Sequence, residues 1–448
     1  MGRLFGTDGI RGVANRELTP ELAFRLGLAV AHTAWEAGDG ARQQILIGKD
    51  TRLSGDLLEA ALTAGILAAG VDVLAAGMLP TPAVAHLTRD CGAAAGAMIS
   101  ASHNPVEDNG IKFFSASGYK LPDAWEDRIQ QLVEEGGEPI HRPTAAGLGR
   151  RRVLEDGAAR YLEHLRGLVP VRLEGCRVAV DAACGAAAGL ASRLLRDLGA
   201  QVIAIHDDPD GARINVACGS TDPAALQETV VREDAQLGLA FDGDADRCLA
   251  VDERGELVDG DHLLAILGLA MLRRGELAEG TVVATVMSNL GLHQIIAAHG
   301  GRVVTTRVGD RYVLEELSRG GYSLGGEQSG HLIFPRLSTT GDGILTALQL
   351  LRVWSEEGQP LSRLAAAMTV WPQVLVNVRV ARRDGLLERE RVREVVDRAR
   401  TRLGDTGRVL VRPSGTEPVV RVMVEAPREA DARDLAEEIA VAIAEEVV

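Results

Sequence analysis

The chain has few cysteines and no long, uninterrupted hydrophobic run. Its five cysteines are odd in number and lack the spacing of a metal site, so they indicate reduced thiols in a cytoplasmic protein. The most apolar region, residues 60–85, is interrupted by Asp72, Pro80 and Pro82, which argues against a membrane span. Residues 1–7 lack the apolar core of a signal peptide. The sequence therefore predicts a cytoplasmic protein without a membrane anchor.

Positive charge is also scarce, because 48 Lys and Arg residues face 63 Asp and Glu residues, a net charge of −15. This balance argues against nucleic acid or an anionic membrane as a partner. Lysine is rarer still, since the only lysines are Lys49, Lys112 and Lys120. A desolvated lysine can lose its proton, whereas arginine stays charged. Lys112 is therefore a candidate general acid or base, the alternative being chance survival in an arginine-biased composition.

The length of 448 residues exceeds what one core can hold and predicts three or four domains. An apolar strand, an amphipathic helix and further strands ending in a polar, Gly-rich loop recur three times, which predicts three successive mixed α/β domains at 1–152, 153–254 and 255–368. Residues 369–448 have a different pattern and predict a smaller C-terminal α+β domain, which would form a lid on a central cleft. The predicted strands include 44–48, 92–99, 177–181, 237–241, 281–285, 322–324, 374–380, 408–412 and 419–425.

The loop after the first group of strands carries Ser102, His103, Asn104 and Lys112. It therefore places a hydroxyl, an imidazole, an amide and an ammonium group close together in the sequence. A serine hydroxyl is a poor nucleophile alone, and it needs neighbours that take its proton or neutralise charge on a migrating group. This composition indicates phosphoryl transfer, with Ser102 as the nucleophile.

Three aspartates, Asp242, Asp244 and Asp246, alternate with Gly and Ala directly after a predicted strand. Alternate side chains of extended backbone share a face, so three carboxylates can converge on a hard divalent cation. An EF-hand would need glycine where Arg247 stands, and an aspartyl-nucleophile phosphatase would have Thr or Val there. We reject both, and a solvated acidic turn remains as the alternative to a metal site.

The segment 412–418, at the connection of the last two strands, begins with Arg412 and offers two hydroxyls and a glycine, and Arg421 follows three residues later. Charge-assisted and main-chain hydrogen bonds from such a loop can cradle a phosphate. An ordinary turn would explain the glycine and the prolines but not the arginines. The candidate phosphate-binding residues are Arg412, Ser414, Gly415, Thr416 and Arg421.

Two other loops carry candidate binding groups. Glu327 and Ser329 offer a carboxylate and a hydroxyl, which suit the adjacent OH groups of a polyol. His331 follows them and could equally be a structural histidine. Near the N-terminus, Arg11 could reach a transferred phosphoryl group, while Asp8 could simply order the turn.

With these motifs the chain closely resembles the α-D-phosphohexomutase superfamily. The resemblance runs from the loop 6–12 to the final strand, and the forms GEQSGH at 326–331 and RPSGTEPVVRVMVE at 412–425 are similar to the glucosamine branch. The chain departs from the common pattern at Cys184, where Asn is usual, and at Val106, where an aromatic residue is usual. Neither position has a catalytic role in the family.

The resemblance implies an isomerase that interconverts glucosamine 6-phosphate and glucosamine 1-phosphate through a bound 1,6-bisphosphate. It also implies that Ser102 is carried as phosphoserine, and that one Mg2+ per subunit binds Asp242, Asp244, Asp246 and the phosphoserine. The product would feed the synthesis of UDP-N-acetylglucosamine for a bacterial cell wall. The implied partners are a small-molecule hexosamine phosphate, no nucleic acid and no membrane, with a homodimer left open.

The resemblance also assigns roles to the other candidates. Lys112 would be the general acid/base, with His103 and His331 as lesser candidates, and Arg11 and Arg247 would offset phosphoryl charge. Glu327 and Ser329 would hold sugar hydroxyls, and the Arg412 loop would hold the non-reacting phosphate. The nearest alternatives are phosphomannomutase or phosphoglucomutase activity. An alternative of another class is a non-catalytic sugar-phosphate sensor, which would be expected to have lost the nucleophile or a metal carboxylate.

Overall fold

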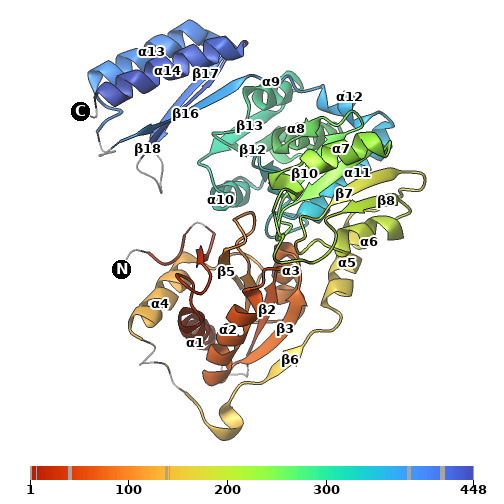
Figure 1. The fold of residues 1–448 in the computed structure, drawn as a ribbon, viewed down its shortest axis with the longest axis vertical. Helices are drawn as coiled ribbons and strands as arrows, with labels where there is room; N and C mark the ends of the chain where they lie inside the picture. Colours follow the sequence, from red (N-terminus) through yellow and green to blue (C-terminus); the bar gives the residue numbers. More distant parts are fainter. Residues whose placement is uncertain are drawn as a thin grey trace.

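The computed structural model describes residues 3–6, 8–38, 43–136, 140, 142–380, 385–413 and 419–446. Within these ranges the chain forms four sheets, which define the first, second, third and C-terminal units used below. Figure 1 shows the first three units following one another through the body of the molecule, with the C-terminal unit projecting at the upper left. This arrangement confirms the predicted fold class, and the predicted domain boundaries stay predictions. No helix of the described residues is long and apolar enough to cross a membrane.

The first unit contains a mixed sheet with strand order β1-β5-β4-β2-β3-β6. Strand β2 pairs in parallel with β3 and β4, whereas β5 is antiparallel to β1 and β4. The alternation of strand and helix thus gives a mostly parallel centre with an antiparallel edge. The strands are β1 (Ile10–Val13), β2 (Gln44–Lys49), β3 (Asp72–Met78), β4 (Ala95–Ile99), β5 (Asp108–Ser115) and β6 (Arg151–Val153). The helices are α1 (Pro20–Ala37), α2 (Gly55–Ala68), α3 (Thr81–Asp90), α4 (Asp123–Glu134) and α5 (Gly157–Leu168), the last of which leads to the second unit.

Helices α1 and α2 pack closely because glycines stand at their contact. A Cβ atom on Gly27 would lie 2.3 Å from the carbonyl oxygen of Leu62, and one on Gly65 would lie 2.1 Å from that of Phe24. The start of α1 is fixed by Thr19, whose side chain accepts a hydrogen bond from the backbone N–H of Leu22. Local capping and helix contact together hold this layer against the sheet.

The second unit has strand order β11-β10-β9-β7-β8. Strand β7 is parallel to β8 and β9, and β10 is antiparallel to β9. The tight β9–β10 connection carries the three aspartates at the end of a fully buried strand. The elements are β7 (Arg177–Asp181), α6 (Leu190–Asp197), β8 (Gln201–Ile205), α7 (Ala224–Arg232), β9 (Leu237–Phe241), β10 (Cys248–Asp252) and β11 (Leu257–Val258).

The third unit has strand order β13-β12-β14-β15. The predicted strand at 322–324 was wrong in its bounds, because the observed strand begins at Leu324. The preceding helix α10 ends in a left-handed Gly321, so the chain first aligns with β12 at Leu324, opposite Val282. Its elements are α8 (Gly260–Arg273), β12 (Thr281–Thr285), α9 (Leu290–Ala298), β13 (Arg302–Thr306), α10 (Asp310–Gly320), β14 (Leu324–Gly326), β15 (Leu332–Ile333), α11 (Gly343–Glu357) and α12 (Leu361–Ala365).

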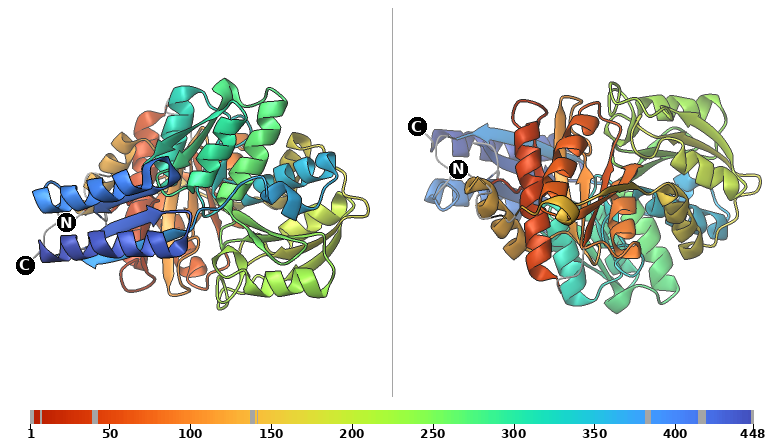
Figure 2. Two further views of the ribbon diagram at one scale, coloured as in Figure 1. Left: turned by 90° about the horizontal axis from the view of Figure 1, so that it is seen from above. Right: turned by 90° about the horizontal axis from the view of Figure 1, so that it is seen from below.

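The C-terminal unit is an antiparallel sheet with order β16-β18-β17 and its own hydrophobic core. Figure 2 shows α13 and α14 lying side by side along this unit. The small sheet with two helices agrees with the predicted α+β unit, although β16 pairs with the last strand, β18, and not with β17, which follows it in the chain. The elements are β16 (Gln373–Arg379), α13 (Glu390–Leu403), β17 (Arg408–Pro413), β18 (Val419–Glu425) and α14 (Glu429–Glu445).

A buried carboxylate, Glu425, joins the third and C-terminal units. Its Oε1 accepts hydrogen bonds from the backbone N–H of Leu290 (3.2 Å) and from Nε2 of Gln373 (3.1 Å). Its Oε2 accepts from Nε of Arg408 (2.7 Å), and Arg408 Nη2 donates to the carbonyl oxygen of Ser288 (2.7 Å). Glu425 and Arg408 therefore act together as a charged tie across this junction.

We expect Glu425→Gln to lower the free energy of unfolding by about 2 kcal/mol, because the Arg408 guanidinium loses its charged acceptor. Urea denaturation followed by fluorescence would measure the loss, since Trp371 lies at the same junction, its indole N–H donating to the Gln294 side chain.

Glu429→Gln is the matched control. Glu429 pairs with Arg433 on the surface of α14, and exposed pairs contribute less than about 1 kcal/mol. Equal losses in the two variants would contradict the assignment of Glu425 as the tie.

Candidate active site

Ser102 lies in the turn between β4 and β5, and it is buried in a left-handed conformation with φ of +52°. Its backbone N–H donates to Oγ of Ser100 (2.9 Å). Its carbonyl oxygen accepts from Nη2 of Arg52 (3.0 Å) and from Nδ2 of Asn215 (2.8 Å). A positive φ is uncommon for a residue with a side chain and must be imposed by its surroundings. These contacts therefore hold the hydroxyl in one direction.

Arg52 and Asp50, in the loop after β2, hydrogen-bond to the Ser102 turn. The sequence analysis did not identify either residue. Arg52 is buried, and its guanidinium donates to the carbonyl oxygens of Asn104 (2.7 Å) and Asp108 (2.9 Å). Asp50 Oδ2 accepts from Nε of Arg52 (3.1 Å) and from Oγ of Ser100 (2.6 Å). Burial raises the pKa of Asp50 to about 6, although Arg52 opposes the rise. Polar residues directly after an apolar strand were the signal that could have identified them.

The three aspartates meet the hydroxyl of Ser102. Ser102 Oγ donates to Oδ2 of Asp242 (2.6 Å), and oxygens of Asp242, Asp244 and Asp246 lie within 4.8 Å of one another. All three residues are buried, and Oδ1 of Asp244 and Oδ1 of Asp246 have no hydrogen-bond partner in the described part of the chain. Burial and the charges of the other two aspartates raise the pKa of Asp242. Converging, unsatisfied carboxylate oxygens fit a hard divalent cation such as Mg2+.

The prediction that Lys112 lies in the Ser102 loop was wrong, because the chain returns from this loop as β5 and pairs Lys112 with Met98 of β4. The Lys112 side chain lies against the aspartate cluster. Its Nζ is 3.0 Å from Oδ2 of Asp244, 3.0 Å from Oδ2 of Asp8 and 3.7 Å from Oδ2 of Asp246. Thr81 Oγ1 donates to the same oxygen of Asp244 (2.6 Å), a contact that the sequence did not predict. Burial lowers the pKa of Lys112, but the carboxylates Asp244, Asp8 and Asp246 outweigh burial and raise it. Lys112 therefore carries its proton beside the carboxylates.

The two candidate histidines differ in charge. His103 Nδ1 lies 3.3 Å from Oγ of Ser102, and burial, with help from nearby arginines, lowers the pKa of His103 to about 4. His331 Nδ1 lies 3.5 Å from Oδ2 of Asp246, and its Nε2 lies 3.8 Å from Oδ2 of Asp310. Burial opposes protonation of His331, but Asp246 outweighs burial, and the pKa of His331 rises to about 9. At neutral pH His103 can accept a proton, whereas His331 is a cation.

Two guanidinium groups border the serine and the aspartates. Arg11 Nη1 donates to Oδ1 of Asn104 (2.9 Å), and its Nη2 pairs with Asp8. Arg247 Nε lies 3.8 Å from Oδ1 of Asp246. The buried Nε atoms of Arg11 and Arg247 make no hydrogen bond to other described residues. Both groups can therefore donate to an anion placed at Ser102.

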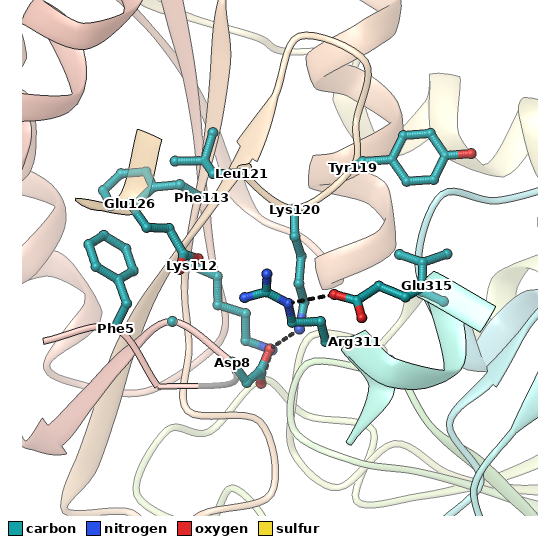
Figure 3. Close-up of a pocket in the computed structure, with 12 residues that line it drawn as sticks. Phe5, Asp8, Lys112, Phe113, Tyr119, Lys120, Leu121, Glu126, Arg311 and Glu315 are labelled. Carbon is teal, nitrogen blue, oxygen red and sulfur yellow. Dashed lines mark hydrogen bonds and ion pairs between the residues drawn. The ribbon is translucent and has the colours of Figure 1, made fainter. Parts of the chain in front are cut away.

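A second lysine connects the first unit to the third. Lys120 Nζ lies 2.6 Å from Oδ2 of Asp310, at the start of α10, and 3.0 Å from Oδ1 of Asp8. Figure 3 shows Lys120, Asp8 and Lys112 around a cavity of about 140 Å3 that Arg311 also lines. The scarcity of lysine could have identified Lys120, but no local pattern indicates its distant partner.

The loop after β14 carries the predicted sugar-binding residues. Glu327 Oε1 accepts a hydrogen bond from the backbone N–H of Gly309 (3.0 Å). Ser329 Oγ is buried and has no hydrogen-bond partner among the described residues. Between them, Gln328 donates to Oδ2 of Asp259 (3.2 Å), which anchors the loop to the start of α8. The loop thus has polar atoms still able to bind a ligand.

Arg412 and Arg421 face each other across the β17–β18 pair. Burial and the charge of Arg421 lower the pKa of Arg412. Two adjacent cations favour an anion between them. Ser414, Gly415 and Thr416, the other predicted phosphate-binding residues, lie outside the described residues.

Comparisons with known proteins agree along the whole chain. Family models of phosphoglucomutase/phosphomannomutase match in order as alpha/beta/alpha domain I (residues 2–139), domain II (159–255), domain III (259–370) and the C-terminal domain (375–442). Phosphoglucosamine mutase from Desulforudis audaxviator is 56% identical over 439 residues, which cover 98% of this chain and 97% of the relative. Phosphoglucosamine mutase from Rhodococcus jostii is 55% identical over 444 residues, which cover 99% and 100%.

Solved structures share the fold. A phosphoglucomutase/phosphomannomutase family protein from Burkholderia thailandensis has a TM-score of 0.82 and 25% identity, covering 99% of this chain and 97% of that one. An N-acetylphosphoglucosamine mutase from Aspergillus fumigatus, in complex with GlcNAc-6P and magnesium, has a TM-score of 0.71 and 19% identity, covering 99% and 96%. The family models and the close relatives confirm the resemblance expected from the motifs. The chain therefore belongs to the phosphoglucosamine mutase family, an isomerase branch of the phosphohexomutase superfamily.

Proposed function

We propose that the protein interconverts glucosamine 6-phosphate and glucosamine 1-phosphate, with Ser102 as the phosphoryl carrier. The observation that supports this most directly is the hydrogen bond of Ser102 Oγ to Asp242 (2.6 Å), beside the unsatisfied oxygens of Asp244 and Asp246. A hydroxyl placed against a cation site is the arrangement that phosphoryl transfer requires. We infer that the sugar is glucosamine because the close relatives are phosphoglucosamine mutases.

In the first half-reaction, the P–O bond to Ser102 breaks and a new P–O bond forms to O1 of glucosamine 6-phosphate. The resulting 1,6-bisphosphate reorients within the site. Its 6-phosphoryl group then passes to Ser102, and glucosamine 1-phosphate is released. Asp242, Asp244 and Asp246 would hold one Mg2+ together with phosphoserine, and the bound cation supplies Lewis-acid stabilisation of phosphoryl charge. Arg11 and Arg247 add positive charge from the protein at the same place.

Each transfer also moves a proton. The attacking sugar hydroxyl loses a proton as its P–O bond forms, and a proton is available for the serine oxygen as its own bond breaks. We assign Lys112 to the general acid/base role and expect it to act as the acid, because it is buried and its contacts with Asp244 and Asp8 at 3.0 Å keep it protonated. His103 is the second candidate, since it is uncharged and lies 3.3 Å from Ser102 Oγ. His331, held as a cation by Asp246, is better suited to electrostatic stabilisation.

The remaining residues would bind the parts of the substrate that do not react. Glu327 and Ser329 would hold the sugar hydroxyls, since Ser329 Oγ is buried with no hydrogen-bond partner among the described residues. Arg412 and Arg421, with Ser414, Gly415 and Thr416, would hold the distal phosphate in both half-reactions. A C-terminal unit that closes over the site would also keep water from phosphoserine.

Substrate competition tests the proposal. Purified protein, primed with a hexose 1,6-bisphosphate, is assayed on glucosamine 6-phosphate, glucose 1-phosphate and mannose 1-phosphate. We expect the highest kcat/KM on glucosamine 6-phosphate, and a higher value on either other sugar would assign the chain to another mutase activity. Absence of turnover on all three, together with absence of phosphate on Ser102 by mass spectrometry, would support the non-catalytic sensor instead.

A further inference from the structure

A second group of metal-ligating side chains, Asp181, His206 and Cys218, lies in the second unit outside the proposed catalytic machinery. One donor atom from each residue lies within 4.8 Å of the other two. Asp181 and Cys218 are fully buried, whereas the side chain of His206 is 27% exposed. The group therefore has a buried base and an opening to solvent on the imidazole side.

The three side chains come from three separate connections. Asp181 is the last residue of β7, His206 follows β8, and Cys218 directly precedes a short 3-10 helix. His206 has a φ of +47°, and its carbonyl oxygen accepts a hydrogen bond from the backbone N–H of Cys184 (2.8 Å). The carbonyl oxygen of Cys218 accepts from Oγ1 of Thr221 (3.1 Å). Main-chain and side-chain contacts thus fix the directions of the donors before any ligand binds.

The donors are one carboxylate oxygen, one imidazole nitrogen and one sulfur. Asp181 Oδ2 and His206 Nδ1 are 3.0 Å apart, and Asp181 Oδ1 accepts from the backbone N–H of Ala183 (2.9 Å), which orients the carboxylate. The Cys218 thiol donates to the carbonyl oxygen of Arg213 (3.7 Å), and a second buried thiol, that of Cys184, is close enough to influence it. Zinc accepts mixed O, N and S ligands, often three from the protein with one position left open, whereas magnesium takes oxygen ligands.

The same three residue types could in principle form a nucleophilic Cys-His-Asp arrangement. Cys218 is 0% exposed, so no substrate can reach its sulfur. Burial also raises the pKa of the Cys218 thiol to about 12, whereas a nucleophilic cysteine needs a lowered one. A small cation can enter beside the partly exposed His206, and it displaces the protons of its ligands when it binds.

We propose that Asp181, His206 and Cys218 bind a thiophilic divalent cation such as Zn2+, with Cys184 as an adjacent sulfur. The bound cation ties β7, β8 and the loop before Cys218 together. That loop includes Asn215, whose side chain donates to the carbonyl oxygen of Ser102 (2.8 Å). A cation bound at this site therefore stabilises the loop that positions Asn215 against the Ser102 turn.

Cobalt is the probe that separates this site from the three aspartates. Reduced protein is titrated with Co2+ in excess Mg2+, and the thiolate-to-cobalt charge-transfer absorption is recorded. The aspartate cluster has only oxygen donors and binds Mg2+, so it contributes no such band. We expect the wild-type chain to show the band with about one Co2+ bound, and Zn2+ to abolish it by displacement.

Variants decide which residues hold the probe. Cys218→Ser is expected to lose the band, and Cys91→Ser, a partly buried cysteine of the first unit, is the matched control that keeps it. Cys218→Ser could lose the band simply by misfolding, because Cys218 is buried. His206→Gln, at a partly exposed position, tests the site independently. It is expected to weaken Co2+ binding at least about tenfold and to lose the rise in Tm that Zn2+ gives the wild type. No band in the wild type, or an unchanged band in Cys218→Ser, would overturn the proposal.

Discussion

Ser102→Ala is expected to lower mutase turnover by about 10⁴-fold or more, since removal of a covalent nucleophile typically costs this much. Alanine deletes the oxygen that would carry the phosphoryl group, and no neighbouring side chain can replace it. Asp242 and His103 contact that same oxygen at 2.6 Å and 3.3 Å, so both lose this contact in the variant. Turnover is measured with glucosamine 6-phosphate, and intact-mass spectrometry reports whether the chain still carries a phosphoryl group.

Ser117→Ala is the control, because Ser117 is an exposed serine of the same unit whose hydroxyl contacts only Ser115 among the interactions found for it. It should retain both turnover and phosphorylation. Near-normal turnover of Ser102→Ala, or a phosphoryl group that persists at another residue, would exclude Ser102 as the carrier.

Asp242→Asn is expected to change stability and activity in opposite directions. Burial and the charges of Asp246 and Asp244 disfavour ionised Asp242, so the neutral amide should raise the Tm of the cation-free protein. The same change removes a carboxylate ligand of the cation. It also replaces the charged acceptor of the Ser102 hydrogen bond with a neutral amide. We therefore expect turnover to fall at least about 10²-fold and the affinity for Mn2+, used in place of Mg2+, to fall with it.

Calorimetry gives both the Tm and the Mn2+ affinity of this variant. Asp234→Asn is the matched control, because Asp234 is exposed in the same unit and has a φ of +50°, a conformation that asparagine tolerates. It should leave all three quantities unchanged. A fall in Tm for cation-free Asp242→Asn would show that repulsion between Asp242 and the other two aspartates does not limit stability.

Much of the secondary structure follows from the sequence. Strands β7, β9, β12 and β18 begin and end at the residues predicted. Each is a short segment rich in apolar residues, and only β18 has a charged residue, Arg421, in its interior. The strand β14 was placed two residues too early at its start. Its Gly325 and Gly326 were taken as loop, whereas pairing with β12 and β15 puts both in the sheet.

Partners distant in the chain could not be predicted. Arg52 supports the Ser102 turn from another loop, and Lys120 meets Asp310 from 190 residues away. The sequence around Arg52 and Lys120 marks them as polar residues but does not indicate their partners. Their contacts depend on how strands order within a sheet and how one unit packs on the next, and no local pattern encodes either.

The sequence by itself determined the donor sets that lie on one stretch of backbone. Asp242, Asp244 and Asp246 share one loop, and their oxygens do meet. The backbone there is a turn with a left-handed Ala245, however, and not the extended segment that the spacing suggested. Tertiary structure decided which hydroxyl meets them, by placing Ser102 2.6 Å from Asp242. It also brings together a group that the cysteine spacing did not predict, because the parallel pairing of β7 with β8 places Asp181 beside His206, and the loop that follows brings in Cys218. Side chains that come from the ends of separate strands have no fixed spacing in the sequence. Only the folded sheet brings them together.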